Sequence, residues 1–215
     1  VAEAIDEESP EHLKEELGDL LLQVVMHARM EEEEGRTGLT GVADGICKKL
    51  IYRHPHVFGG LTVTGTGQVL ANWDELKKKE KHQDTAADSV DAVARSLPGL
   101  WRAEKIQKKA AKVGFDWDSV DGAMDKLREE TEELQTAIRE GSNVSEELGD
   151  LLFAAVNVAR FVKVDPETAM TAACDKFARR FRAVEEAARA QGKDLSSMSL
   201  AEMDALWDAV KQQEA

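Results

Sequence analysis

Two pairs of acidic residues in the second half of the chain have the spacing of a metal site. Glu130 and Glu133 are three residues apart, as are Glu147 and Asp150, so each pair shares one face of a helix. If the two helices run antiparallel, all four carboxylates converge between them. Carboxylate oxygens are ligands that Mg²⁺ and Mn²⁺ prefer, with water and phosphate oxygens completing the coordination. The spacing therefore predicts a divalent-cation site.

Glu130 differs from an ordinary surface glutamate because it lies within an apolar stripe. It follows Leu127 by three residues and precedes Leu134 by four. Burying an ionised carboxylate costs several kcal/mol unless it is paired or coordinates a cation. The alternative is a solvated helix face, on which Lys126 and Glu130 form a routine ion pair four residues apart. A di-iron site would need Glu-x-x-His, a spacing that the chain lacks.

Asn157 extends this acidic face, since it follows Asp150 by seven residues, or about two helical turns. We expect its side chain to contact substrate beside the acids. The alternative is an asparagine at the edge of the core with a local hydrogen-bond partner. Met26 occupies the corresponding position of an earlier, related segment, which indicates that only the second half keeps a working site.

That related segment shows that the chain is an internal duplication. Glu-Glu-Leu-Gly-Asp-Leu-Leu occurs at Glu15–Leu21 and again at Glu146–Leu152. Solenoid repeats recur every 20 to 50 residues or so, and the longer period here indicates two copies of a domain. The first copy keeps Glu16 and Asp19, whereas its upstream acidic pair would fall before residue 1. We therefore expect an inactive N-terminal helical domain at residues 1–85 and a catalytic domain at residues 95–215.

The elements that must position these residues are helices. Prolines and aromatic residues are few, and long stretches are rich in Ala, Glu, Leu and Lys, which predicts an all-α fold of tandem helical bundles. Both copies of the repeated segment should open amphipathic helices that bury one face, with Pro10 in the first turn of one and Ser145 capping the other. We expect helices at about 9–34, 40–53, 67–83, 101–112, 119–140, 144–162, 166–191 and 199–213.

The segments between these helices carry weaker signals. The glycine-rich stretch Gly59–Gly67 is not followed by Gly-Lys-Ser/Thr, so we expect a surface loop and not a phosphate loop. The polar run Lys77–Asp88 is the expected linker between the domains. Cys47 and Cys174 occupy matching positions of the two copies, which predicts small buried side chains and no disulfide.

Composition excludes several classes of protein. The 42 acidic and 28 basic residues give a formal net charge of −14, which repels the phosphate backbone of DNA and RNA. Apolar runs fall well short of the roughly 20 residues of a membrane span, and the chain does not open on a signal-peptide pattern. We therefore expect a cytoplasmic protein that binds neither nucleic acid nor membrane.

Several motifs, in order, resemble the MazG family of nucleoside triphosphate pyrophosphohydrolases over nearly the whole chain. The family signature, Glu-Glu-x-x-Glu followed on the next helix by Glu-x-x-Asp, matches Glu129–Glu133 and Glu147–Asp150. The segments Arg53–Phe58, Val113–Trp117 and Lys176–Phe181 are also similar to two-domain members. The resemblance implies an all-α homodimer with Mg²⁺-dependent hydrolysis of nucleoside triphosphates to monophosphate and pyrophosphate, with Mn²⁺ able to substitute.

The resemblance also implies roles for single residues. It makes Glu130, Glu133, Glu147 and Asp150 the metal ligands. It places the basic residues Lys176 and Arg180 at the phosphates, and it makes Trp207 and Lys211 the C-terminal contacts to base and phosphate. The alternatives for these last four residues are surface charges and a tryptophan that anchors a helix in the core.

Two further carboxylates, Glu129 and Glu146, are candidates to orient or deprotonate the attacking water, and the sequence does not distinguish them. The leading hypothesis is a house-cleaning enzyme with broad base specificity for NTPs and dNTPs. A narrower enzyme for noncanonical nucleotides is a near alternative. A non-enzymatic helical scaffold with solvated acids is the alternative from a different class.

Overall fold

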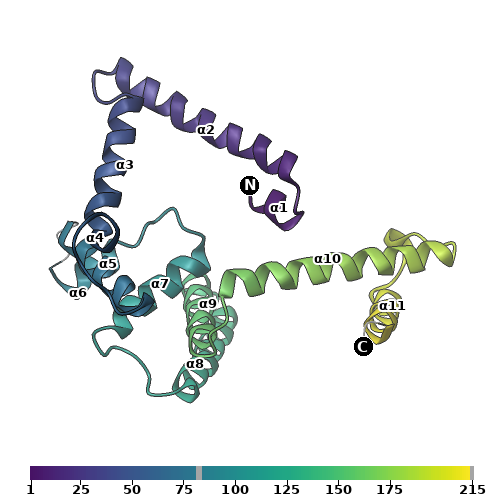
Figure 1. Cartoon of the computed structure of the whole chain (residues 1–215). Helices are drawn as coiled ribbons and strands as arrows, with labels where there is room; N and C mark the ends of the chain where they lie inside the picture. The colour runs from purple at the N-terminus through teal and green to yellow at the C-terminus, as the bar shows by residue number, and fades with distance from the viewer. Residues whose placement is uncertain (81–83, 214–215) are drawn as a thin grey trace. The chain divides into compact units, whose positions relative to one another are not determined.

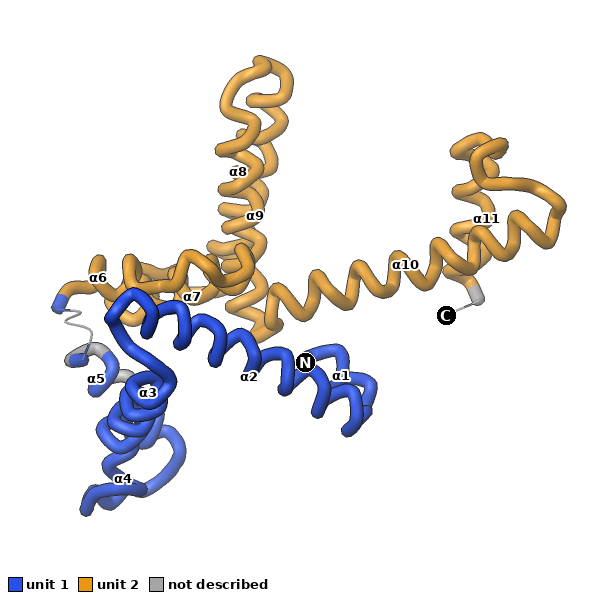
Figure 2. The backbone as a smooth tube through the Cα atoms, turned by 90° about the horizontal axis from the view of Figure 1, so that it is seen from above, with its two compact units in different colours: residues 1–84 blue, residues 85–215 orange. Residues whose placement is uncertain are grey.

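The computed structural model describes residues 1–80 and 84–213, and those residues form helices and no β-strand. The chain divides into two compact units, residues Val1–Asp84 and Thr85–Ala215, which are coloured separately in Figure 2. Figure 1 shows the order of the helices along the chain. None of the described helices is long and apolar enough to cross a membrane. The predicted all-α fold is confirmed.

The N-terminal unit contains the first copy of the repeat on its longest helix. Ser9 caps that helix by accepting a hydrogen bond from the His12 backbone at 3.3 Å, and Pro10 occupies its first turn as the sequence predicts. The apolar side chains of this helix then recur at helical spacing. The elements of the unit are α1 (Ala2–Asp6), α2 (Pro10–Glu33), α3 (Leu39–Arg53), α4 (Pro55–Phe58) and α5 (Thr66–Glu80).

The C-terminal unit contains two pairs of helices that follow each other in sequence. Figure 2 shows α8 and α9 side by side as a hairpin, and α11 folds back against α10. The bounds of these four helices agree to within one residue with the predicted helices 119–140, 144–162, 166–191 and 199–213. The elements are α6 (Ala86–Asp91), α7 (Gly99–Ala111), α8 (Val120–Glu140), α9 (Val144–Phe161), α10 (Pro166–Ala190), the 3₁₀ turn η1 (Leu195–Ser197) and α11 (Leu200–Gln213).

Local chemistry fixes the α8–α9 hairpin. The Ser119 hydroxyl accepts a hydrogen bond from the Asp121 backbone at 3.2 Å and caps α8. Gly141 ends α8 with φ of 69°, a left-handed conformation that favours glycine. Asn143 precedes α9, whereas the predicted cap Ser145 lies inside the helix, so the prediction of Ser145 as the cap is wrong. The turn of three residues between Glu140 and Val144 forces α8 and α9 to run antiparallel.

Small residues form the buried centre of the hairpin. Ala123 and Ala137 on α8 and Ala154 and Val156 on α9 are all buried. Their short side chains let the two backbones approach closely along most of the hairpin, which brings the acids of the two helices together. The side chains that hold α8 and α9 in register are therefore apolar, and the acids do not supply that stability.

The larger apolar side chains of the repeated segment are exposed in a single chain, against the prediction that each helix buries one face. Leu20 and Leu21 on α2 are 54% and 61% exposed, and Leu148 and Leu152 on α9 are 46% and 45% exposed. The buried residues of α9 are the small side chains of Ala154 and Val156. Amphipathic periodicity correctly placed these helices, yet it did not say which partner covers the apolar face.

Two local predictions also need correction. The segment Lys77–Asp88 is not all linker, because α5 continues to Glu80 and α6 begins at Ala86, where Thr85 and Asp88 form a reciprocal capping box. Residues 81–83, the end of the predicted helix 67–83, lie outside the described residues. Both cysteines are free, as expected, but Cys47 and Cys174 are exposed and not buried.

Candidate functional site

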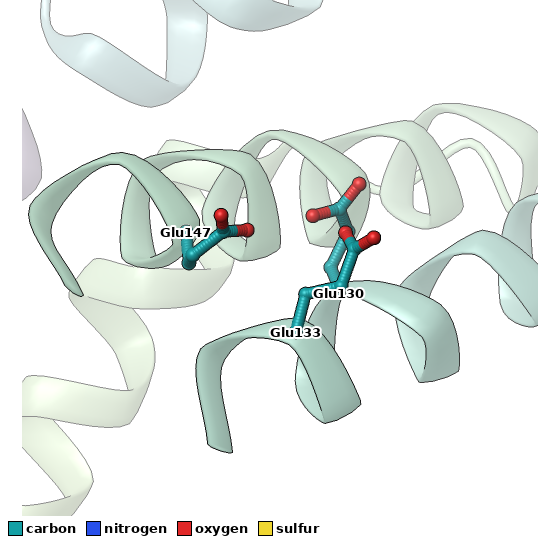
Figure 3. Close-up of side chains that lie close together, drawn as sticks. All are labelled: Glu130, Glu133 and Glu147. Carbon is teal, nitrogen blue, oxygen red and sulfur yellow. The ribbon is translucent and has the colours of Figure 1, made fainter. Parts of the chain in front are cut away.

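Three carboxylates meet between α8 and α9. Oxygen atoms of Glu130, Glu133 and Glu147 all lie within 4.8 Å of one another. Figure 3 shows that Glu130 and Glu133 rise from one helix and that Glu147 comes from its neighbour. Within residues 1–80 and 84–213, this is the one group of His, Cys, Asp or Glu side chains with the geometry to hold a metal ion. The convergence predicted from the spacing is therefore present for three of the four acids.

Glu130 is the buried member of this carboxylate cluster, which we define as Glu130, Glu133 and Glu147. It is only 5% exposed, as its place in the apolar stripe predicts. One of its oxygens accepts a hydrogen bond from Lys126 Nζ at 2.6 Å. The other, Oε2, is buried and has no hydrogen-bond partner among the described residues. A buried carboxylate oxygen without a donor is costly, so this atom has the chemistry of a cation ligand.

Charge repulsion within the cluster is visible at Glu133. Partial desolvation and then the negative charge of Glu130 raise the pKa of the Glu133 carboxyl above its usual value. Glu129 and Glu147 add to the repulsion, while Lys126 opposes it. The cluster therefore holds more negative charge than the surrounding side chains neutralise, and a divalent cation would relieve that excess.

Lys126 is a functional candidate, although its spacing from Glu130 in the sequence is that of a routine surface ion pair. Its ammonium group donates to Glu129 at 2.8 Å and to Glu130 at 2.6 Å. These two hydrogen bonds, to Glu129 first, raise the pKa of Lys126. Spacing alone could not show that Lys126 contacts the carboxylate cluster, because i,i+4 ion pairs are common on exposed helices. Burial of Glu130 distinguishes this pair from the others.

A polar cavity of about 420 Å³ adjoins the carboxylate cluster. It lies at the hairpin end of α8 and α9, and its wall includes Thr136 and Ser142 as well as glutamates. Glu129 lines this cavity, whereas Glu146 is not among its lining residues, which distinguishes the two carboxylates that sequence left equivalent. The lining residues are Glu129, Glu132, Glu133, Thr136, Ala137, Glu140, Ser142, Asn143 and Glu147.

Asp150 and Asn157 lie on α9 but outside the carboxylate cluster. Asp150 is exposed, one helical turn after Glu147. Asn157 accepts hydrogen bonds from the Arg160 guanidinium at 2.7 and 3.1 Å and lines a different cavity. In the single chain, its observed partner is therefore the local one that sequence analysis kept as the alternative.

The four predicted basic and aromatic contacts lie on the α10–α11 pair. Trp207 packs against Phe177 with ring centroids 5.2 Å apart, and the Arg180 guanidinium lies 6.0 Å from the Trp207 ring centroid. Lys176 and Lys211 are exposed on the same two helices. None of these predicted contacts lines the acidic cavity within the described chain. The structure thus brings Arg180 and Trp207 together but leaves them apart from the acids.

The N-terminal unit repeats this basic and aromatic arrangement. Arg53 lies 5.6 Å from the ring centroid of Trp73, and it occupies the position in the first copy that Arg180 occupies in the second. Arg53 is also paired with Glu80 at 2.7 Å. The duplication therefore extends beyond the acidic motif to an arginine on a tryptophan in each unit.

Comparison with known proteins places this duplication in a family. The MazG nucleotide pyrophosphohydrolase domain matches residues 1–58 and again 119–184. The chain belongs to the MazG family. Both matched segments contain a copy of the repeated acidic motif, and the second contains the whole carboxylate cluster.

Relatives that match over nearly all of this chain support membership of the MazG family. The chain is 42% identical over 218 residues to the nucleoside triphosphate pyrophosphohydrolase of Escherichia coli, covering all of this chain and 83% of the relative. It is 39% identical over 209 residues to the nucleoside triphosphate pyrophosphohydrolase/pyrophosphatase MazG of Thermotoga maritima, covering 97% and 80%. Bacillus subtilis YabN, an uncharacterized protein, is 48% identical over 215 residues, covering 99% of this chain and 44% of the relative.

Proposed function

We propose that this MazG family member hydrolyses nucleoside triphosphates and deoxynucleoside triphosphates to the monophosphate and pyrophosphate, with broad base specificity. The observation that carries the proposal is the carboxylate cluster with the unpartnered Glu130 oxygen, beside a polar cavity. The relatives named as nucleoside triphosphate pyrophosphohydrolases match over the whole chain, which supports the same reaction class. Such an enzyme would act on cytoplasmic nucleotide pools.

The chemistry of the cluster fits Mg²⁺. Three carboxylates supply hard oxygen ligands from two helices, and one of their oxygens is buried without a donor. Glu130, Glu133 and Glu147 would hold the ion, and Asp150 would join them after a side-chain rotation, since it lies one helical turn after Glu147 on α9. Mg²⁺ bound there would offset carboxylate charge and polarise the triphosphate oxygens. Mn²⁺ has the same ligand preference.

Residues around the cluster would activate the attacking water and position the carboxylates. Glu129 lines the cavity and is 57% exposed on its side chain, so it can accept a proton from a water at the α-phosphorus, and we prefer it to Glu146 as the base. Lys126 holds Glu129 and Glu130 in place through its two hydrogen bonds. The pyrophosphate then leaves in line with the attacking water.

We further propose that the active enzyme is a homodimer. Phe177 and Phe181 on α10 stack with centroids 6.0 Å apart yet remain 58% and 47% exposed, and Leu148 and Leu152 on α9 are also exposed. Exposed apolar side chains grouped on one helix in this way are typical of a surface that a partner protein covers. A second copy that covers α9 with α10 would also bring Lys176 and Arg180 to the triphosphate.

The test is incubation of the full chain with a panel of NTPs and dNTPs, with Mg²⁺ or with EDTA, while the products are resolved. We expect monophosphate and pyrophosphate with all bases, and turnover only with the metal. Diphosphate and phosphate as products would reject the proposal, as would an absence of turnover. Sedimentation should give twice the 23.7 kDa chain mass, and a monomer that turns over at full rate would reject the dimer.

A further inference from the structure

A second cavity, of about 340 Å³, lies between α7, the loop that follows it, and α9. It shares no lining residue with the acidic cavity. Three aromatic side chains and one buried amide contribute to its wall. The lining residues are Ile106, Gln107, Ala110, Gly114, Phe115, Asp116, Trp117, Phe153, Asn157 and Arg160. Its volume falls in the lower part of the roughly 300–1,000 Å³ range of small-molecule sites.

The loop that forms one wall is held firmly in place. Gly114 has φ of 85°, and the Phe115 backbone donates to Ala110 at 3.2 Å, so the end of α7 is closed by a left-handed glycine turn. The Asp116 carboxylate accepts from the Trp117 backbone at 3.0 Å. Trp117 lies so close to Gly122 that a Cβ there would approach its ring at 3.0 Å. These contacts fix the conformation of the loop, and with it the shape of this wall of the cavity.

Gln107 supplies the polar group of the cavity. It is only 7% exposed, and its amide nitrogen donates to the Phe153 carbonyl at 2.8 Å. Because a carbonyl can only accept, this bond fixes which end of the amide is nitrogen. The remaining atom, Oε1, is buried and has no hydrogen-bond partner among the described residues. The cavity thus presents a buried acceptor that needs an N–H or O–H donor.

The charge in the cavity is already balanced. Arg160 is the only cationic residue among those that line it, and its guanidinium donates to both oxygens of Asp116 and to the Asn157 side chain. The bond to one Asp116 oxygen measures 2.9 Å, and Arg160 holds the pKa of the Asp116 carboxyl below its usual value. A phosphate would therefore find no unpaired positive charge on this wall, and a neutral ligand fits better.

The aromatic side chains indicate a planar ligand. Phe115 is 83% exposed, Trp117 is 47% exposed and Phe153 is 42% exposed, although all three line the cavity. Exposed rings around a hollow gain most when a flat ring stacks on them, and nucleobases stack on aromatic side chains whatever their sequence. An exocyclic amino group on such a base would supply the donor that Gln107 Oε1 lacks.

We propose that this cavity is a second, non-catalytic site that binds a neutral nucleoside whose base carries an amino group, such as adenosine. Phe115 and Trp117 stack on the base, and Gln107 Oε1 accepts from the amino group. The choice of a nucleoside over other planar heterocycles rests on the proposed function in nucleotide hydrolysis. The site itself rests on the cavity and on Gln107.

Calorimetric titration of the full chain with adenosine in EDTA tests the proposal, with purine riboside as the matched ligand because it lacks the amino group. We expect saturable adenosine binding and about tenfold weaker binding of purine riboside, since the latter leaves the buried acceptor without a donor. Phe115→Ala should weaken adenosine binding about tenfold. Val113→Ala should leave binding unchanged, because Val113 is a similarly exposed neighbour that does not line the cavity.

The result is separable from the outcome for catalysis. Adenosine binding that survives in Asp150→Asn supports a separate site, whether or not the wild-type chain hydrolyses triphosphates. Equal affinity for the two ligands, insensitivity to Phe115→Ala, absence of binding at millimolar adenosine, or loss of binding in Asp150→Asn would each overturn it.

Discussion

The two copies of Glu-Glu-Leu-Gly-Asp-Leu-Leu lie in different surroundings. In the C-terminal unit, α8 runs beside α9 and adds Glu130 and Glu133 to Glu147. In the N-terminal unit, α2 carries the matching Glu16 and Asp19, but the described residues contain no second cluster of three acids. Both units keep an arginine on a tryptophan. The difference teaches that the repeated motif supplies only one carboxylate of the cluster, Glu147, and that the adjacent helix supplies the other two.

The largest expected effect is the difference in turnover between variants that lack matching acids of the two units. Asp150→Asn is expected to lower kcat/KM by more than about 100-fold. Mutation of a residue that only hydrogen-bonds to a metal ligand already lowers metal affinity or activity about 10- to 100-fold. Asp19→Asn should leave most of the turnover. Steady-state hydrolysis of one NTP measures both. Comparable losses in the two variants would show that the N-terminal unit is catalytic as well.

Mg²⁺ binding should distinguish the two units without any turnover. At about 100 times its dissociation constant, a ligand stabilises the folded state by about 2.7 kcal/mol, which corresponds to a rise in Tm of about 5 to 10 °C for a chain of this size. We expect Glu147→Gln to abolish this rise and its counterpart Glu16→Gln to preserve it. Calorimetric melting with Mg²⁺ and with EDTA provides the measurement. If Mg²⁺ still raised the Tm of Glu147→Gln, the carboxylate cluster would not be the metal site.

The two arginine–tryptophan pairs offer a smaller contrast. Trp207→Ala should raise KM for a nucleoside triphosphate about tenfold, because base stacking and the cation–π contact with Arg180 are both lost. Trp73→Ala should leave KM unchanged, since the described residues of the N-terminal unit contain no carboxylate cluster beside which a nucleotide would bind. A comparable rise in both variants would mean that the N-terminal unit also contacts the nucleotide.

The smallest effect concerns acid stability of α11. Glu202 accepts hydrogen bonds from Lys193 at 2.6 Å and from the Ser199 backbone at 2.9 Å, which lowers its pKa from 4.5 to about 2. A lowered folded-state pKa stabilises the protein above pH 4.5 and loses that contribution as the pH falls towards 2. Glu202→Gln should therefore lower Tm slightly at pH 7 and not at pH 2. A Tm difference that does not depend on pH would indicate lost packing instead.

Helix positions were largely predictable because their signals are local. Helical spacing of Leu and Val residues, the turn at Gly141 and the position of Pro10 predicted α2, α8 and α9 closely. Ser145 failed as a cap and α6 was missed, because capping depends on which backbone amide a short side chain reaches. The burial of Glu130 followed from its place in the apolar stripe.

The site itself was only partly predictable. Convergence of Glu130, Glu133 and Glu147 followed from spacing and from a short turn. The sequence could not show that Asn157 binds Arg160, a local contact, or that Arg160 binds Asp116 across 44 residues of chain. It also could not show that Lys176 and Trp207 lie apart from the acids in a single chain, because the spacing of residues within one helix does not determine the direction of the next helix.

The sequence by itself determined the helices, the duplication, the excess of negative charge and the identity of the acidic helix faces. These properties depend on residue type and on separations within one or two helical turns. Only the tertiary structure decided that small residues such as Ala123 and Ala154 let α8 and α9 approach until three carboxylates meet, and that Gln107 keeps a buried oxygen without a donor. Those outcomes depend on packing between segments far apart in sequence, where distance and burial are set by the neighbouring helix.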